Sequence, residues 1–253
     1  MPMYEGSDLL SSSAAPAVRR IDHLVVAIPA RDEAPNLPAA LAAIETARAA
    51  LAAWDPHPPR VVVVVAADSC TDTTAELARE AGATVVETFV GKVGAARSAA
   101  VATGLAAAGA PSACWIACTD ADSVVHVDWL RVHLAAARGG ADLLLGSVRP
   151  SPVDLTPHQL ARWHRLNPQA EAHPYVHGAN LGVRADSYLQ VGGFADVGEH
   201  EDAALVEALR TAGAVVVTTD RAPVTTSGRT HGRTPGGFAA YLRTAVLRDT
   251  PER

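Results

Sequence analysis

Two carboxylates end an apolar stretch of the sequence. Residues 115–118 (WIAC) are apolar, and Asp120 and Asp122 follow with one residue between them. In an extended chain, residues two apart share a face, so the two negative charges repel each other unless a cation lies between them. Oxygen ligands favour hard divalent cations over zinc, and the expected cofactor is therefore Mn2+ or Mg2+.

A pair of carboxylates fills only part of a divalent cation's coordination shell. Magnesium and manganese keep positions for water and for substrate phosphates, so the pair predicts a phosphorylated ligand. Lys92 and Arg97 follow a predicted strand and are candidates to add positive charge near that ligand.

Composition limits the classes of function. The chain has 253 residues, 49% of them hydrophobic, which suits one large α/β domain or two small ones. A formal net charge of -6, without a cluster of Lys and Arg interleaved with aromatic residues, disfavours nucleic acid as a partner. The longest apolar run, 61–67, is far shorter than the ~18 residues of a membrane span, and three cysteines make no disulfide framework. The sequence predicts a soluble cytoplasmic protein.

The hydrophobic pattern alternates between strands and helices. Asn36, Asp128 and the pair Thr73 and Glu76 stand where helix N-caps are expected. Such alternation predicts an α/β fold with a mostly parallel central sheet and helices on both faces. The predicted strands are 21–28, 61–67, 84–87, 113–118, 143–145, 180–184 and 214–218, and the predicted helices are 36–54, 73–82, 91–109, 128–138 and 201–212.

Polar residues follow each of the first four predicted strands. Residues 31–33 follow the first strand, Asp68 the second, 91–92 the third and 120–122 the fourth. Ligands of parallel α/β sheets bind beyond the carboxyl ends of the strands, so these residues are predicted to form one site.

Seven motifs carry a family resemblance. In this order they resemble the motifs of family 2 glycosyltransferases, which have the GT-A fold and belong to the nucleotide-diphospho-sugar transferase superfamily. The resemblance covers about residues 22 to 220. The motifs are VAIPARDE at 26–33, ADSCTDTT at 67–74, GKVGAAR at 91–97, TDAD at 119–122, GANLGVR at 178–184, VGGF at 191–194 and HED at 200–202.

The resemblance implies a nucleotide-diphosphate sugar as donor and a hexosyltransferase type of activity. Asp68 matches the carboxylate that binds the base, although the family usually has two adjacent acids and Ala67 takes the first place here. Asp122, beside Asp120, matches the direct metal ligand. The residues predicted to bind the nucleotide-sugar are Pro29, Arg31, Glu33, Asp68, Lys92, Arg97, Asp120 and Asp122.

The resemblance also implies catalytic residues. Asp202, next to Glu201, matches the base that takes the proton of the acceptor hydroxyl, and His231 is a candidate third metal ligand. The leaving diphosphate accumulates negative charge in an oxocarbenium-like transition state, which the metal with Lys92 or Arg233 nearby would stabilise. A single displacement predicts inversion at the anomeric carbon.

The implied domain organisation has three parts. Residues 1–20 are a mobile leader, and 21–227 form the GT-A domain, with a nucleotide-sugar half at about 21–125 and an acceptor half at about 126–227. Residues 228–253 form a C-terminal loop and helix that close over the site. In that tail, Phe238, Tyr241, Leu242 and Val246 have helical spacing, which suits covering the core, pairing subunits or peripheral membrane contact.

Other interpretations stay open. A sugar-phosphate nucleotidyltransferase has a similar sheet, and a non-catalytic nucleotide-sugar-binding relative would keep the fold without turnover. The sequence indicates neither the acceptor nor the oligomeric state. Trp163, His164, Tyr175 and His177 are candidates to line an acceptor cleft, since sugars pack on aromatic faces.

Overall fold

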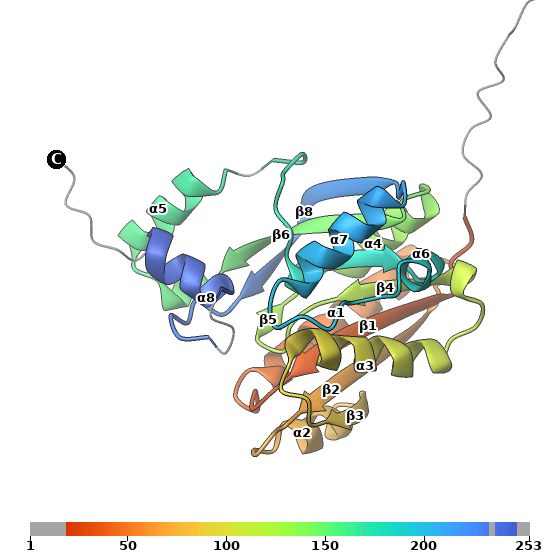
Figure 1. Ribbon diagram of the computed structural model, residues 1–253, viewed down its shortest axis with the longest axis horizontal. Helices are drawn as coiled ribbons and strands as arrows, with labels where there is room; N and C mark the ends of the chain where they lie inside the picture. The colour runs from red at the N-terminus through yellow and green to blue at the C-terminus, as the bar shows by residue number, and fades with distance from the viewer. Residues whose placement is uncertain (1–18, 169, 233–235, 247–253) are drawn as a thin grey trace, which may run out of the picture.

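The computed structural model describes residues 19–168, 170–232 and 236–246 (Figure 1). Most of the predicted leader, Arg233 and the last seven residues lie outside these ranges. The division into a leader, two halves and a closing tail stays a prediction, because no boundary is tested directly.

One eight-stranded sheet runs through the molecule in the order β3-β2-β1-β4-β7-β6-β8-β5. Every strand predicted from the sequence is present, and the two-residue strand β5 is added. β7 runs antiparallel to both neighbours and β5 antiparallel to β8, while the other pairs are parallel. The strands are β1 (His23–Ala30), β2 (Arg60–Asp68), β3 (Thr84–Thr88), β4 (Cys114–Cys118), β5 (Ser123–Val124), β6 (Leu143–Pro150), β7 (Leu181–Arg184) and β8 (Val216–Thr226).

The antiparallel strand β7 has a physical origin in the segment that precedes it. A strand parallel to its neighbour needs a crossover that returns the chain to the end of the sheet where the neighbouring strand begins. After β6 the chain instead makes an excursion over residues 151–180 and re-enters between β4 and β6 from the opposite end. The prediction of a mostly parallel sheet is confirmed, with this reversal in its centre.

Helices cover both faces of the sheet (Figure 1). On one face α1 and α4 bury residues such as Leu41, Ile44 and Leu134, and on the other α3, α6 and α7 bury residues such as Val101 and Leu205. The prediction of two covered faces is therefore confirmed. The helices are α1 (Leu37–Trp54), α2 (Thr74–Glu80), α3 (Val93–Ala106), α4 (Trp129–Arg138), α5 (Pro157–Leu166), α6 (Ala185–Gln190), α7 (Glu201–Thr211) and α8 (Phe238–Tyr241), with a π-helical turn at Leu242–Val246.

The side-chain caps predicted from the sequence do not form. Asn36 precedes α1, but its side chain donates a hydrogen bond to Glu33 Oε2 at 2.7 Å instead of capping the helix. Thr73 makes no cap bond to α2, and Asp128 accepts from Arg131 at 2.7 Å. These polar side chains have nearby partners that compete with the helix termini.

Helices α5 and α8 form a small unit of their own. α5 begins with a capping box between Thr156 and Gln159. Its Trp163 packs against Leu242 and Val246 of the turn that continues α8, in a cluster separate from the main core. The helical spacing of the tail is confirmed, and its apolar side chains cover α5, a helix that the sequence did not indicate.

Two of the three free cysteines, Cys114 and Cys118, are buried in β4, where burial raises the pKa of each thiol to about 12.

Among the described helices, none has the length and apolar character needed to span a bilayer.

A neutral histidine lies in the core between the sheet and α4. His133 is fully buried, and its Nδ1 accepts a hydrogen bond from Trp115 Nε1 at 3.1 Å. Burial lowers the pKa of His133 to about 3, although Asn180 partly opposes this. A group whose pKa is depressed by folding stabilises the protein above its unfolded pKa, about 6.5, and that contribution is lost as the pH falls.

We expect the free energy of unfolding to fall by about 2 kcal/mol between pH 6.5 and pH 5 through His133 alone. His133→Gln keeps an acceptor for Trp115 but cannot titrate, so its stability should depend less on pH in this window. Urea denaturation measures both proteins, with the exposed His57 changed to Gln as the control. Equal pH dependence in His133→Gln and the wild type would contradict the assignment.

Candidate active site

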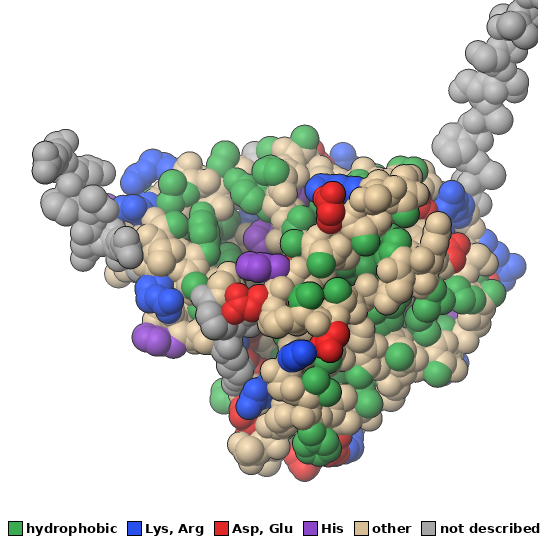
Figure 2. Space-filling view, in the orientation of Figure 1, with side chains coloured by type: hydrophobic (Ala, Val, Ile, Leu, Met, Phe, Trp, Pro, Cys, Tyr) green, Lys and Arg blue, Asp and Glu red, His purple; other side chains and the backbone are tan. Residues whose placement is uncertain are grey.

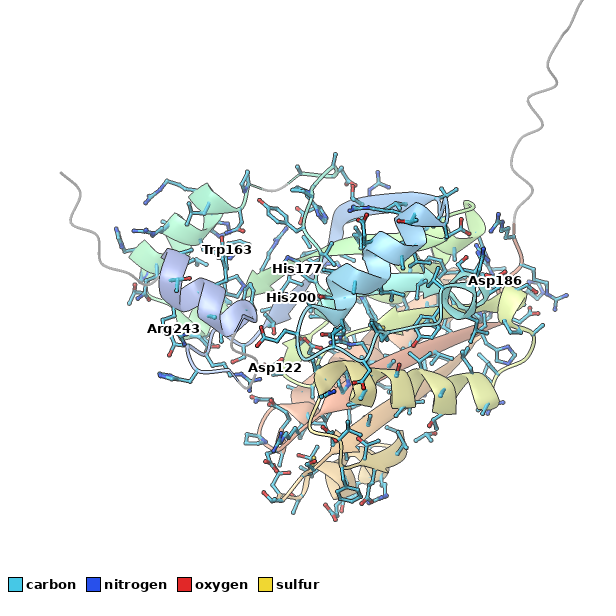
Figure 3. The ribbon with its side chains drawn as sticks, viewed as in Figure 1. Asp122, Trp163, His177, Asp186, His200 and Arg243 are labelled. Carbon is cyan, nitrogen blue, oxygen red and sulfur yellow. The ribbon has the colours of Figure 1, made fainter. Side chains whose placement is uncertain are left out.

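A cavity of about 610 Å³ opens beyond the carboxyl ends of β1, β2 and β4. α7, α5 and α8 form its other walls, and in Figure 3 the labelled Asp122, Trp163, His177 and His200 lie around it, whereas Asp186 lies far from it. Figure 2 shows histidine and acidic side chains near the centre of the same face. Ten residues singled out from the sequence line the cavity: Pro29, Arg31, Glu33, Asp68, Lys92, Arg97, Asp120, Asp122, Glu201 and Asp202.

The carboxylate of Asp122 faces a guanidinium that the sequence analysis did not single out. Arg229, on the loop after β8, places Nη2 2.9 Å from Asp122 Oδ2 and donates from Nη1 to Glu33 Oε1 at 2.8 Å. The other Asp122 oxygen lies 3.3 Å from the hydroxyl of Thr226. Arg229 follows the last strand on the site edge of the sheet, and this position was the only signal in the sequence.

The acidic group around Asp122 fits a hard divalent cation. Burial raises the pKa of Asp122 to about 6, and the charges of Asp120 and Glu33 add to this, whereas Arg229 opposes it. Three carboxylates thus crowd together with only part of their repulsion offset. Oxygen donors that repel one another are the ligands that Mg2+ and Mn2+ prefer, so Asp122 and Asp120 are suited to hold such an ion.

Arg97, predicted to bind the nucleotide-sugar, lines the cavity, and its guanidinium is paired with two carboxylates. Its side chain is almost fully buried and donates to Glu201 from Nη1 and to Asp120 from Nη2, the latter at 2.8 Å. Burial alone would lower the pKa of Arg97, but the two carboxylates outweigh it and raise that pKa. The charge of Arg97 is already compensated, and it ties α3 to the loop after β4 and to α7.

Two glycines leave room for this buried ion pair. A Cβ on Gly94 would lie 2.9 Å from the Glu201 side chain, and a Cβ on Gly178 would lie 2.8 Å from the Arg97 guanidinium. Both distances are shorter than a carbon can accept. The glycines of the GKVGAAR and GANLGVR motifs thus serve the packing around the pair.

Asp202 lines the cavity from the first turn of α7. Its Oδ2 accepts from the backbone N–H of Gly178 at 2.8 Å, and its Oδ1 accepts from that of Ala203 at 2.8 Å. Each oxygen keeps a free lone pair. The N-terminus of α7 favours negative charge here, and His200 before it adopts the left-handed conformation at φ 62°. Glu201, predicted to share the catalytic role, also lines the cavity and forms an ion pair with Arg97.

Asp68 is buried at the end of β2 and is fixed by the next strand. Its Oδ1 accepts from the backbone N–H of Val90 at 2.9 Å and from the hydroxyl of Thr88 at 3.0 Å. The carboxylate is therefore held at the cavity wall, where it lies among the lining residues. Ala67, in the place of a second acid, is itself buried.

Lys92 and Arg31 lie at the rim. The ammonium group of Lys92 is 2.8 Å from Asp196 Oδ1, and both side chains are largely exposed. Arg31 is exposed, and no described residue forms a salt bridge with it. A guanidinium in this state is available to an anionic ligand.

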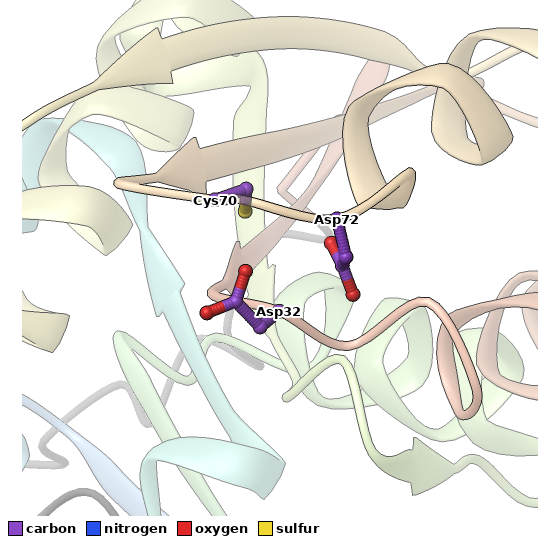
Figure 4. A group of neighbouring side chains, drawn as sticks. All are labelled: Asp32, Cys70 and Asp72. Carbon is purple, nitrogen blue, oxygen red and sulfur yellow. The ribbon is translucent and has the colours of Figure 1, made fainter.

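The predicted metal role of His231 has no support in the described geometry. Its side chain is exposed, its Nδ1 lies 3.0 Å from the Thr230 hydroxyl, and it is not among the described residues that line the cavity. The one group of three close metal-binding side chains among the described residues is elsewhere: Asp32, Cys70 and Asp72 (Figure 4). Two of these, Asp32 and Asp72, accept hydrogen bonds from backbone N–H groups of the loops that follow β1 and β2.

The aromatic prediction is confirmed in part. Trp163, Tyr175 and His177 line the cavity, whereas His164 does not appear among its lining residues. Phe238 and Tyr241 of α8 also line it, although the sequence analysis did not assign them to the site. Burial lowers the pKa of His177, and the nearby charge of Asp202 partly opposes this.

Comparisons with known proteins agree with this geometry. The family model described as Glycosyl transferase family 2 matches residues 25–187. No curated protein matches the sequence.

Solved structures with the GT-A fold resemble the chain. The mannosyltransferase PcManGT from Pyrobaculum calidifontis, in complex with GDP-Man and Mn2+, is 22% identical with a TM-score of 0.59. The match covers 87% of this chain and 61% of that one. Glucosyl-3-phosphoglycerate synthase from Mycobacterium tuberculosis, with Mn2+, UDP and phosphoglyceric acid, is 17% identical with a TM-score of 0.55, over 90% and 78% of the two chains.

A third structure, S. aureus TarS, is 16% identical with a TM-score of 0.57, and the match covers 83% of this chain but 37% of that one. The chain thus spans less than two thirds of the mannosyltransferase and of TarS. At these identities the likeness shows the fold.

We expect Arg97→Met to lower the free energy of unfolding by about 3–5 kcal/mol, because it leaves Glu201 buried without a partner. Adding Glu201→Gln should recover part of that loss by removing the uncompensated charge. Lys92→Met, which breaks an exposed ion pair, is the matched control and should cost about 1 kcal/mol or less. Denaturant titration of the three variants measures this, and an Arg97→Met cost no larger than that of Lys92→Met would contradict the structural role.

Proposed function

The chain belongs to glycosyltransferase family 2, a family of enzymes, and from this premise we propose that it transfers a sugar from a nucleoside-diphosphate donor to an acceptor hydroxyl with inversion. One observation carries the proposal: a single cavity is lined by the carboxylates Asp120 and Asp122, which follow β4, and by the carboxylate of Asp202, in the first turn of α7. A metal-dependent displacement needs an anionic metal site at the leaving group and a base at the nucleophile.

The donor nucleotide would lie along the ends of β1, β2 and β4. Asp68, fixed by β3 and the loop after it, is placed to accept hydrogen bonds from the base. Arg31, exposed and without a described ion pair, is placed to bind a phosphate. A guanidinium recognises phosphate oxygens through two parallel N–H groups.

Asp122 and Asp120 would hold the divalent cation, as Mn2+ accompanies the nucleotide in the mannosyltransferase and in the synthase structures. When bound, such an ion neutralises charge that develops on the diphosphate. Arg229 links Asp122 to Glu33 and so holds the loop after β8 against the loops that follow β4 and β1. Its guanidinium lies where it could also donate to phosphate oxygens.

Asp202 would act as the general base. As the bond between the acceptor oxygen and the anomeric carbon forms and the bond to the diphosphate breaks, Asp202 takes the hydroxyl proton. The backbone N–H groups of Gly178 and Ala203 fix the orientation of the carboxylate before the reaction. Arg97 acts indirectly, since it anchors Glu201 in the same helical turn.

Asp202→Asn should lower kcat for transfer about 10²–10⁴-fold, because the amide cannot accept the proton, and should leave the KM for the donor nearly unchanged. Steady-state kinetics measures both constants. NMR of the product gives its anomeric configuration, which we expect to be inverted relative to the donor. Transfer at the wild-type rate by Asp202→Asn would remove the assignment of the base.

Nucleotide binding tests the proposal before any sugar is known. We expect thermal stability to rise with one of UDP, GDP, CMP or dTDP, and more in the presence of Mn2+. A ligand at a hundredfold excess over Kd stabilises the folded state by about 2.7 kcal/mol. Asp122→Asn should lose the Mn2+-dependent part of the thermal shift. The substitution removes one of the crowded carboxylate charges whose mutual repulsion a bound cation would relieve.

Asp72→Asn is the matched control, since Asp72 lies in the other acidic group and outside the cavity. Its Mn2+-dependent shift should equal that of the wild type. If the Mn2+-dependent thermal shift were lost in Asp72→Asn and kept in Asp122→Asn, the metal would bind at Asp32, Cys70 and Asp72, and the proposed site would be wrong. Absence of a shift with every nucleotide would contradict the donor, and consumption of nucleoside triphosphate with release of pyrophosphate would indicate a nucleotidyltransferase.

A further inference from the structure

The two ends of the cavity differ in chemistry. The end at β1, β2 and β4, here called the donor end, holds Arg31, Lys92 and Arg229. The fourth Lys or Arg side chain among the described lining residues, Arg97, lies beside Gly178 and is paired with Glu201 and Asp120. The opposite end is formed by α5, residues 173–178 and α8. Figure 3 shows Trp163 and His177 on this side of the cavity, and Arg243, also on this side of the molecule, is exposed and does not line it.

Aromatic rings are concentrated at the opposite end. The whole sequence has 4 Trp, 4 Tyr and 3 Phe. Four of these eleven line this part of the cavity, and an imidazole accompanies them. The five residues, here called the aromatic wall, are Trp163, Tyr175, His177, Phe238 and Tyr241.

The rings of the aromatic wall form a continuous surface. Tyr175 stacks on His177 with centroids 6.2 Å apart, and the edge of His177 meets Phe238 at 6.4 Å. Phe238 lies 6.3 Å from Tyr241. These four side chains are half-buried: Phe238 and Tyr241 pack in part against buried apolar clusters, and the rest of each ring is exposed. The wall therefore offers apolar ring surface to a ligand.

Polar groups accompany the rings. Asn167 lines the cavity, and its Nδ2 donates to Tyr241 Oη at 2.8 Å. His177 is followed by Gly178, whose backbone N–H binds the Asp202 carboxylate at 2.8 Å. A molecule on the aromatic wall thus lies next to the proposed base and beside groups that can donate to and accept from hydroxyls.

We infer that the acceptor is an uncharged saccharide, whose C–H face packs on the aromatic wall while one hydroxyl points to Asp202. The inference rests on the proposed glycosyl transfer and names the substrate class of the same site. Large apolar surfaces with a few placed polar groups are typical of small-molecule sites, and rings give this contact at low entropy cost. The carboxylate of Asp202 repels an anion, and among the described residues the aromatic wall itself contains no Lys or Arg that would replace the hydration of a bound anion.

Saturation-transfer NMR tests the class of acceptor with two probes, methyl α-D-glucopyranoside as the neutral saccharide and phosphoglyceric acid as the anion. The protein is first saturated with the nucleotide identified by its thermal shift, so that the donor end is occupied. We expect saturation transfer to the glucoside. We expect Tyr175→Ala and Phe238→Ala each to weaken its binding about 3- to 10-fold through lost ring contact.

Tyr175→Phe is the matched control, because it keeps the ring and should bind the glucoside as the wild type does. The thermal shift with nucleotide shows that each variant is folded. Binding of phosphoglyceric acid without the glucoside, binding of neither probe, or glucoside binding unchanged in both alanine variants would each overturn the inference. In those cases an intact nucleotide shift leaves the proposed transferase standing, whereas loss of that shift in the wild type removes the transferase itself.

Discussion

The buried ion pair between Arg97 and Glu201 is the contact on which the site's arrangement depends. A charge inside a protein must be paired, and the second bond of Arg97, to Asp120, extends the pairing across the cavity. Three segments far apart in the sequence, α3, the loop after β4 and the start of α7, are therefore fixed relative to one another. The ion pairs of Arg97 therefore also fix the positions of Asp122 and Asp202, which are close in sequence to Asp120 and Glu201.

The donor end combines this fixed scaffold with charges that are only partly balanced. Asp122 faces Arg229, yet burial, with the charges of Asp120 and Glu33 added to it, keeps the pKa of Asp122 raised. An excess of negative charge at the mouth of a phosphate site would repel the ligand, and a divalent cation reverses the sign. The same crowding suits the proposed metal site, which needs no closed cage of protein ligands.

The other end of the cavity is built differently. α5 and α8 have their own small apolar cluster, centred on Trp163, and lie apart from the two layers that cover the sheet. Such a unit can hold a ring surface without disturbing the ion pairs of the donor end. In the proposed function, the binding of phosphates and the recognition of an acceptor therefore depend on separately packed parts of the protein.

The sequence by itself determined the strands and long helices, because apolar periodicity and flanking Gly and Pro act locally. It also determined that polar residues after β1, β2 and β4 share one edge, since parallel strands carry their carboxyl ends to the same side. The predicted helix caps do not form, because the side chains of Asn36 and Asp128 bond to Glu33 and Arg131, which the capping pattern does not indicate. The reversal at β7 likewise depends on a long excursion without periodicity.

Only the tertiary structure decided how the charged residues pair. From the sequence, Arg97 was predicted to bind the ligand and Glu201 to take part in catalysis, whereas Arg229 was not singled out. Their bonds join residues 104 and 196 positions apart along the chain, so sequence spacing carries no information on them. The aromatic wall came together in the same way, from α5, residues 173–178 and α8. The residue types determine which chemistry the chain can perform. Long-range packing determines which individual residues of each type are placed to perform it.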